Sequence, residues 1–211
     1  LDGIDNFVDD ILDFTDTWDY HLVVLRNLFD RLRSACLTAR PSKCKLGYTQ
    51  IDFLGHVVGN GMVQPHPDKV ESLQECKRPY TKTQVRSFLG LVGYYRKFIP
   101  NFSEIAHCLT DMTKKGRPNK VDWSDEAETA FRSLIMHITR KPILCLPDWK
   151  LQFILRTDAS DKAIGSVLLQ THGDNTFPVA YASRKLLPRE VRYSVMEREA
   201  LAIVWSVQKF V

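Results

Sequence analysis

Two aspartates stand side by side near the start of the chain, at Asp9 and Asp10. The apolar residues from Ile4 to Phe14 predict two short strands around them, which would place both carboxylates at the tip of a hairpin. Two divalent ions about 4 Å apart, stabilising the attacking and leaving oxygens of a phosphoryl transfer, need such hard oxygen ligands. An ordinary turn explains the same pair, because Asp forms local hydrogen bonds there. The pair by itself leaves both interpretations open.

A second pair of acids lies far along the chain, at Asp158 and Glu199. Alternating apolar residues over 151–157 predict a strand that ends at Asp158, and a helix is predicted to begin at Ser194. Glu197 is explained as the capping-box partner of Ser194, whereas Glu199 has no such local role. Acids from a strand and a helix can meet at one metal pair, so a second phosphoryl-transfer site is a candidate here.

Charge is distributed unevenly along the chain. Residues 1–30 carry eight acids and one base, whereas residues 77–120 carry ten bases and two acids. An acidic site beside a basic arm suits a polyanionic substrate handled with metal ions, since bases neutralise phosphates and carboxylates hold the cations. A solvated basic face has the same composition, so charge does not decide between the two.

The 211 residues are 44% apolar and 26% charged, which suffices for one large domain or two to three small ones. No apolar run approaches the roughly 18 residues of a membrane span, and the first residues lack the features of a signal peptide. We therefore expect a soluble protein with no membrane partner. Five widely spaced cysteines without a C-x-x-C pair favour free thiols in a reducing compartment. Both ends of the chain are interpreted as cuts.

The elements that must position these acids fall into three blocks. In the first block, the Asp9–Asp10 hairpin precedes an amphipathic helix over about residues 18–35. A second hairpin follows, with arms Ile51–Val58 and Met62–Val63 around a turn at Gly59–Gly61. The apolar stripe of the helix comprises Leu22, Leu25, Leu28, Phe29 and Leu32.

The second block is helical and the third is mixed. Residues 67–76 predict a short helix, and Thr81–Gln84 fits a capping box ahead of a longer one. Residues 114–120 are charged and contain Gly and Pro, which is typical of a linker. In the third block a helix is predicted after Ser124. The remaining elements are strands over 151–157, 163–170 and 177–183, followed by the helix from Ser194.

Several motifs resemble one known family. Residues 7–12, Phe-Val-Asp-Asp-Ile-Leu, resemble the aromatic-x-Asp-Asp motif of reverse transcriptases. Phe53-Leu-Gly-His-Val57 follows in the order of gypsy-type LTR retrotransposon polymerases, and residues 85–102 are similar to the thumb of that family. Its tether and RNase H domain resemble residues 123–126, 157–160 and 199–204. Because the ordered motifs cover essentially the whole chain, it resembles a fragment of such a Pol polyprotein.

The resemblance implies an α+β fold in three parts. Residues 1–64 would be the C-terminal part of a truncated palm, built of β-hairpins plus a helix and including the primer grip. Residues 65–120 would be a helical thumb. Residues 121–211 would hold the tether and the N-terminal part of an RNase H-like α/β domain.

The resemblance also implies catalytic roles. Asp9 and Asp10 would be two of three polymerase carboxylates, and Asp158 and Glu199 two of four nuclease carboxylates. All four would be metal ligands, with two Mg²⁺ ions, or Mn²⁺, at each site. The absent acids would lie before this chain and beyond residue 211.

Nucleic-acid contacts are implied at two places. Leu54, Gly55 and His56 would form the primer grip, where a glycine permits close approach, although an ordinary hairpin explains the same residues. In the thumb helix Gly90 and Gly93 cost roughly 1 kcal/mol each relative to Ala, which either close helix packing or contact with the template–primer duplex would offset. The family places Gly90 near the duplex and assigns phosphate contacts to Arg86, Arg96 and Lys97. Core contacts, rather than base stacking, are expected for Tyr94, Tyr95 and Phe98.

Two residues depart from the family pattern. Phe7 stands where Tyr is commoner, and Asp13 stands where the family usually has an apolar residue. The loss of the Tyr hydroxyl is expected to alter packing near the primer end rather than metal binding.

The implied activity is RNA-directed DNA synthesis by two-metal nucleotidyl transfer, with degradation of the RNA strand of RNA–DNA hybrids. Implied partners are an RNA template, a DNA primer, the hybrid, dNTPs and the rest of the Pol polyprotein, including the missing palm and fingers, the remaining RNase H and integrase. The implied location is cytoplasmic, within virus-like particles. We expect this chain to be inactive by itself. The alternative is a decayed or host-retained nucleic-acid-binding module without catalysis.

Overall fold

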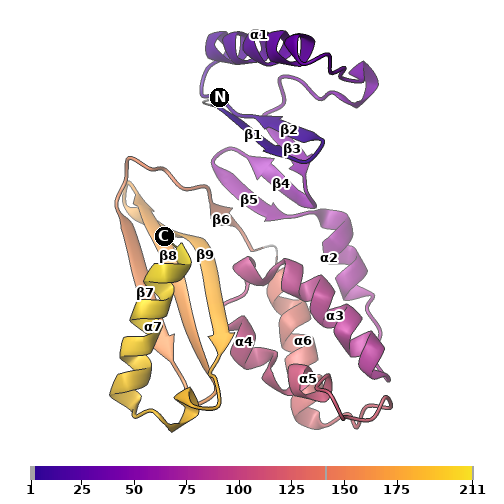
Figure 1. The fold of residues 1–211 in the computed structure, drawn as a ribbon, viewed down its shortest axis with the longest axis vertical. Helices are drawn as coiled ribbons and strands as arrows, with labels where there is room; N and C mark the ends of the chain where they lie inside the picture. Colours follow the sequence, from indigo (N-terminus) through magenta and orange to yellow (C-terminus); the bar gives the residue numbers. More distant parts are fainter. Residues whose placement is uncertain (1–2, 141, 211) are drawn as a thin grey trace. The chain divides into compact units, whose positions relative to one another are not determined.

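The computed structural model describes residues 3–140 and 142–210, and its mixture of helices and sheets confirms the predicted α+β class. The chain divides into two compact units (Figure 1). The first comprises the residues up to 54 together with 58–60, and the second comprises 55–57 and the residues from 61 onward.

The first unit begins with the predicted acidic hairpin. Strands β1 (Ile4–Phe7) and β2 (Asp10–Asp13) pair antiparallel with Phe7 opposite Asp10, which leaves Val8 and Asp9 as the turn. At the open end of the hairpin, the Phe14 N–H donates to the Gly3 carbonyl at 2.8 Å. The hairpin is therefore a closed two-stranded ribbon with Asp9 at its tip.

Helix α1 (Trp18–Ser34) follows, as predicted, and its first turn is capped by the Thr17 hydroxyl, which accepts from the Tyr20 N–H at 3.3 Å. The predicted stripe is confirmed in part. Leu25, Leu28 and Leu32 are half-buried on the side of the helix that also holds the buried His21 and Val24, whereas Leu22 and Phe29 are 48% and 39% exposed. Helix α1 packs against β2.

A meander of short strands links the two units. After a 3-10 turn η1 (Pro41–Lys43) come β3 (Gln50–Phe53), β4 (His56–Gly59) and β5 (Met62–Pro65), and the sheet order is β3-β4-β5-β6, where β6 is Leu144–Cys145. The predicted continuous arm over residues 51–58 is wrong, because a two-residue turn at Leu54 and Gly55 divides it. Leu54 has φ 47° and Gly55 has φ 68°, so both residues have left-handed backbone. Asn, Asp or Gly is typical of the first position of such a turn, and the leucine therefore did not indicate a turn in the sequence.

The helical part contains the three predicted helices, α2 (Pro67–Gln74), α3 (Lys82–Tyr94) and α6 (Asp125–Thr139). It also contains η2 (Arg96–Phe98), α4 (Phe102–Ile105) and α5 (His107–Met112), which the sequence did not predict. The capping box is confirmed, since Thr81 Oγ1 accepts from the Gln84 N–H at 3.2 Å and Gln84 Oε1 accepts from the Thr81 N–H at 3.1 Å. The core of this part includes Val85, Phe88, Val92, Tyr95 and Phe98.

The segment 114–120, predicted as a linker, joins α5 to α6 and accepts hydrogen bonds from α3. Lys82 Nζ donates to the Lys114 carbonyl at 2.5 Å, and the Lys82 N–H donates to the Asn119 carbonyl at 2.8 Å. Arg86 donates to the Thr113 carbonyl at 3.0 Å. Two basic side chains of α3 thus fix the path of a basic loop.

The last part is a three-stranded sheet with one helix. Strands β7 (Phe153–Ala159), β8 (Ala163–His172) and β9 (Asn175–Lys185) are antiparallel in the order β7-β8-β9, and η3 (Glu190–Arg192) leads into α7 (Val195–Phe210). The capping box at Ser194 and Glu197 is confirmed at 2.8 and 3.3 Å. Helix α7 covers one face of the sheet around Ile164, Leu186 and Ala202.

Two whole-chain expectations can also be checked. The five cysteines are free. Within residues 3–140 and 142–210, no helix has the length and apolar character needed to cross a membrane.

Candidate active sites and nucleic-acid contacts

The acidic hairpin presents both of its tip carboxylates to solvent. Asp9 lies in the turn and Asp10 begins β2, and both residues are exposed. The neighbouring Phe7 and Val8 are 57% and 85% exposed, so no side chain of this unit covers the tip. Both carboxylates therefore lie on the surface of the first unit.

Asp13, the residue that departs from the family pattern, has a partner in the structure. Its Oδ2 lies 3.4 Å from His21 Nδ1, and the two side chains are only 16% and 11% exposed. The pair joins the base of the hairpin to the first turn of α1. A polar residue is thus accommodated here because a histidine faces it.

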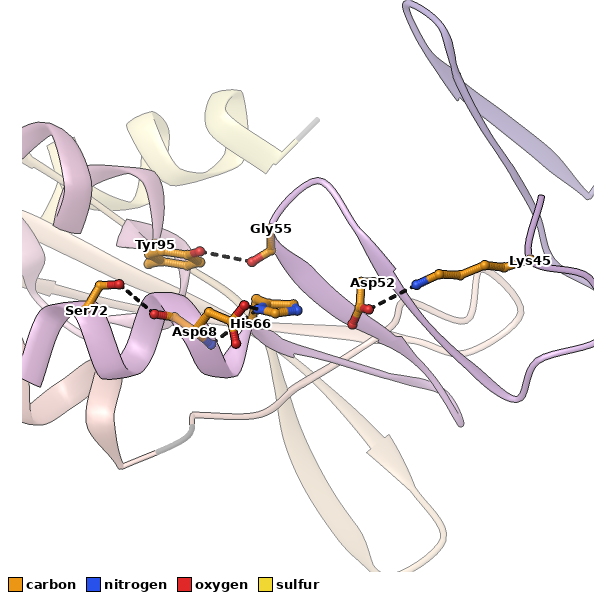
Figure 2. Close-up of polar contacts among 7 residues, drawn as sticks. All are labelled: Lys45, Asp52, Gly55, His66, Asp68, Ser72 and Tyr95. Atoms are coloured by element: carbon orange, nitrogen blue, oxygen red, sulfur yellow. Dashed lines mark hydrogen bonds and ion pairs between the residues drawn. The ribbon is translucent and has the colours of Figure 1, made fainter. Parts of the chain in front are cut away.

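The predicted primer grip is the turn between β3 and β4. The Gly55 carbonyl accepts from the Tyr95 hydroxyl at 2.9 Å, as Figure 2 shows, and from the His66 N–H at 3.1 Å. Burial, and then the neighbouring Tyr94, raise the pKa of Tyr95, which keeps the donating hydroxyl protonated. Tyr95 was predicted only as a core residue, and its role as an anchor had no signal in the sequence because the two residues are 40 positions apart.

His56, the third residue of the predicted grip, lies inside the protein. It is 8% exposed, and its ring centroid lies 5.4 Å from that of Tyr94 and 5.6 Å from that of Phe98. Its ring therefore packs among the aromatic side chains next to the turn. Contact with a primer stays a prediction, carried by Leu54, Gly55 and their backbone.

The glycines of α3 face open space. No heavy atom of the described residues lies within 4 Å of the position that a Cβ would take at Gly90 or Gly93, apart from the helix's own nearby backbone. Close helix packing within the chain therefore does not explain them. Tyr94, one turn beyond Gly90, is 52% exposed while Tyr95 and Phe98 are buried, so the core interpretation is confirmed for the latter two.

Two of the three predicted phosphate-binding bases donate hydrogen bonds within the protein. Arg86 donates to the Thr113 carbonyl, and Arg96 donates to the Ser183 carbonyl. Lys97 is half-buried, and this burial lowers its pKa. An arginine has five N–H donors, so one intramolecular bond leaves others for a phosphate.

The nuclease acids lie on adjoining elements. Asp158 is exposed on β7 and Glu199 is half-buried on α7, which packs against β7. Ala159, the next residue of β7, packs toward α7, so alternation along the strand directs Asp158 to the opposite face, and the described structure does not bring the two carboxylates onto one face of the sheet. Carboxylate oxygens are the donors that Mg²⁺ prefers, so the chemistry of the residues fits. Two carboxylates do not make a complete metal site, and the described part of the chain has no group of three or more ligands that could hold a metal ion.

An antiparallel three-stranded sheet, covered by a helix and carrying an acid near the end of its first strand, is the opening half of an RNase H-like fold. Residues 123–211 match the family described as the RNase H-like domain found in reverse transcriptase.

The similarity to known proteins extends over nearly the whole chain. It is 40% identical over 205 residues to the retrovirus-related Pol polyprotein from transposon 297 of Drosophila melanogaster, covering 97% of this chain and 19% of that protein. It is 32% identical to the transposon Tf2-3 polyprotein of Schizosaccharomyces pombe, covering 96% of this chain and 15% of that protein. The chain thus spans less than a fifth of these relatives, and the predicted likeness to retrotransposon polyproteins is confirmed.

The fold is also found in a solved structure. The foamy viral protease-reverse transcriptase in complex with RNA/DNA hybrid superposes with a TM-score of 0.84 at 24% identity, covering 99% of this chain and 28% of that chain. The chain therefore shares its fold with part of that viral protein.

Proposed function

We propose that this chain is part of an RNA-directed DNA polymerase with RNase H activity from the Pol polyprotein of a gypsy-type LTR retrotransposon. The observation that carries the proposal is the exposed Asp9–Asp10 pair at the tip of a hairpin, in a chain similar to retrotransposon Pol polyproteins over 97% of its length. Its substrates would be an RNA template, a DNA primer and dNTPs.

Each part of the chain has a task in this proposal. Asp9 and Asp10 hold cations at the polymerase site, and Asp158 and Glu199 do so at the nuclease site. Two Mg²⁺ ions, or Mn²⁺, supply charge stabilisation for the attacking and leaving oxygens at each site. The Leu54–Gly55 turn, anchored by Tyr95, presses on the primer backbone.

The duplex would lie against α3. Gly90 leaves room for a close approach, and Arg86, Arg96 and Lys97 supply positive charge. The foamy viral relative of this fold binds an RNA/DNA hybrid, which supports a hybrid as ligand here. The remaining palm and fingers, the rest of RNase H and integrase are proposed as parts of the same polyprotein, located in cytoplasmic virus-like particles.

Primer extension on an RNA template tests the polymerase proposal. In the full-length parent, Asp9→Asn should abolish synthesis because it removes a negative ligand, while Asp5→Asn on the same hairpin should leave synthesis intact. Normal extension by the Asp9→Asn enzyme would remove Asp9 from the metal site. The 211-residue chain alone should incorporate no dNTP, since it holds only two of three carboxylates.

The alternative function is a nucleic-acid-binding module without catalysis, which the ten bases of residues 77–120 would support. Salt-dependent duplex binding without turnover fits both functions for this chain. Flanking sequence separates them. An upstream strand with its own Asp and further acids after residue 211 would indicate an enzyme, whereas stop codons would indicate decay.

A further inference from the structure

Asp158 belongs to a row of residues that crosses the last sheet. Asp158 lies opposite Gly165 on β8, and Gly165 lies opposite Ser183 on β9. Directly opposed residues of antiparallel strands project to the same face. The next row, containing Ile164 and Arg184, contributes to the contacts with α7, so alternation along the strands directs the Asp158 row to the other face.

That other face is where α4 packs against β8 and β9. The Ser103 N–H donates to Ser183 Oγ at 2.9 Å, and Ser183 Oγ donates to Ser103 Oγ at 3.1 Å, with both residues buried. Arg96 donates to the Ser183 carbonyl. Lys185 Nζ donates to Asp111 Oδ1 at 2.8 Å. The helical part is therefore bonded to the strand at the end of the row.

Asn101 contacts the middle of the row. Its backbone is left-handed, with φ 49° and ψ 33°, a conformation that Asn tolerates better than most residues. Its Oδ1 lies 2.3 Å from the position that a Cβ would take at Gly165, so a larger residue there would displace the Asn101 amide. Asn101 and Glu104 line one side of a narrow crevice whose other side includes Asp158 and Ser160.

In the described sheet, the residue of β8 opposite Asp158 is a glycine, which offers no side chain for packing against Asp158. A ligating carboxylate must be held to within roughly half an ångström of its working position. The Asn101 side chain occupies the space beside Gly165 that a side chain at position 165 would otherwise fill.

We propose that Asn101 is a positioning residue for Asp158, holding the Asp158–Gly165 pair so that the RNase H-like site takes one of its walls from the helical thumb. This inference rests on the proposed nuclease function. It assigns a role to Asn101, which lies between η2 and α4.

The test in the full-length parent is Asn101→Gly, which retains the left-handed backbone and removes the side chain. Hybrid cleavage should fall by about 10- to 100-fold, as is usual when a group that supports a metal ligand is lost, and half-maximal cleavage should need more Mg²⁺. A residue with a purely structural role would lower the melting temperature without moving the Mg²⁺ midpoint. An unchanged midpoint would overturn the proposal.

A second measurement needs neither metal nor activity. In the 211-residue chain, Asn101→Gly should speed amide hydrogen exchange in β7 and β8 but not in α1. Gly165→Ala should do the same by displacing Asn101, and the double variant should be no worse than the more affected single one, because the clash is gone. Unchanged exchange in both single variants would also overturn the proposal.

Asp158→Asn in the parent separates this inference from the proposed function, with Asp161→Asn as the matched control. If Asp158→Asn retains hybrid cleavage, the nuclease assignment itself fails. If it abolishes cleavage while Asn101→Gly changes nothing, the proposed function stands and the positioning role is rejected.

Discussion

At the base of the acidic hairpin, Asp13 and His21 form a pair that is largely shielded from water. Both side chains are less than a fifth exposed, and the ring of Trp18 lies 5.4 Å from that of His21. His21 Nε2 and Asp13 Oδ2 are both buried without a hydrogen bond among the described atoms, so the 3.4 Å contact to His21 Nδ1 is the interaction that Asp13 Oδ2 has there. Burying a polar group is unfavourable unless it is paired. Each of the two residues therefore lowers the free-energy cost of burying the other.

The pair should behave non-additively on mutation. His21→Leu leaves a buried carboxyl without its partner and should cost about 1–3 kcal/mol of local stability. Asp13→Val together with His21→Leu should cost less than the sum of the two single changes, since both polar groups are then replaced. Hydrogen exchange of the α1 amides measures this. Strict additivity would mean that the pair does not interact.

Two tight turns in the β3–β5 meander have nearly the same backbone and different residues. Leu54–Gly55 has φ values of 47° and 68°, and Asn60–Gly61 has φ values of 53° and 69°. Asn is favoured at the first of these positions, whereas Leu costs roughly 1–2 kcal/mol there. Strain of this kind concentrates at functional positions, which agrees with a role for Leu54 in gripping the primer.

Leu54→Asn should therefore stabilise the meander by about 1 kcal/mol and, in the parent enzyme, weaken primer binding. The matched exchange, Asn60→Leu, should destabilise the meander by a similar amount with little effect on primer affinity. Urea unfolding and the KM for template–primer measure the two effects. If Leu54→Asn stabilised the protein and left primer affinity unchanged, Leu54 would have no role in the grip.

Positive charge is concentrated in residues 77–120, in the helical part of the second unit. Several of these bases have a second task inside the protein, such as the clamps that Lys82 and Arg86 form with the 113–119 segment. The positive surface is thereby held in a fixed shape. A polyanion binding to it should release counterions and show a steep dependence on salt.

Arg86→Ala should lower the affinity of the 211-residue chain for a hybrid duplex and reduce the slope of log K against log salt by about 1. Arg132, an exposed arginine of α6 that pairs with Glu128, provides the control, and Arg132→Ala should leave the slope unchanged. Fluorescence anisotropy at several salt concentrations measures both. Equal slopes for the two variants would exclude a phosphate contact by Arg86.

The sequence by itself determined the acids, the two capping boxes and the order of helices and strands. Capping at Thr81 and Ser194 depends on residues three positions apart, and strand and helix periods repeat within a few residues, so local sequence suffices for them. The family motifs placed Asp9, Asp10, Asp158 and Glu199 without any knowledge of contacts.

Only the tertiary structure decided which surfaces meet. It showed that α1 buries the polar His21 beside part of its leucine stripe, that Tyr95 donates to Gly55, and that Asn101 lies against Gly165. Each of these depends on segments far apart in the chain, whose burial is set by the partner surface and not by the local pattern. The acids could be named from the sequence, but the residues that hold them in place could not.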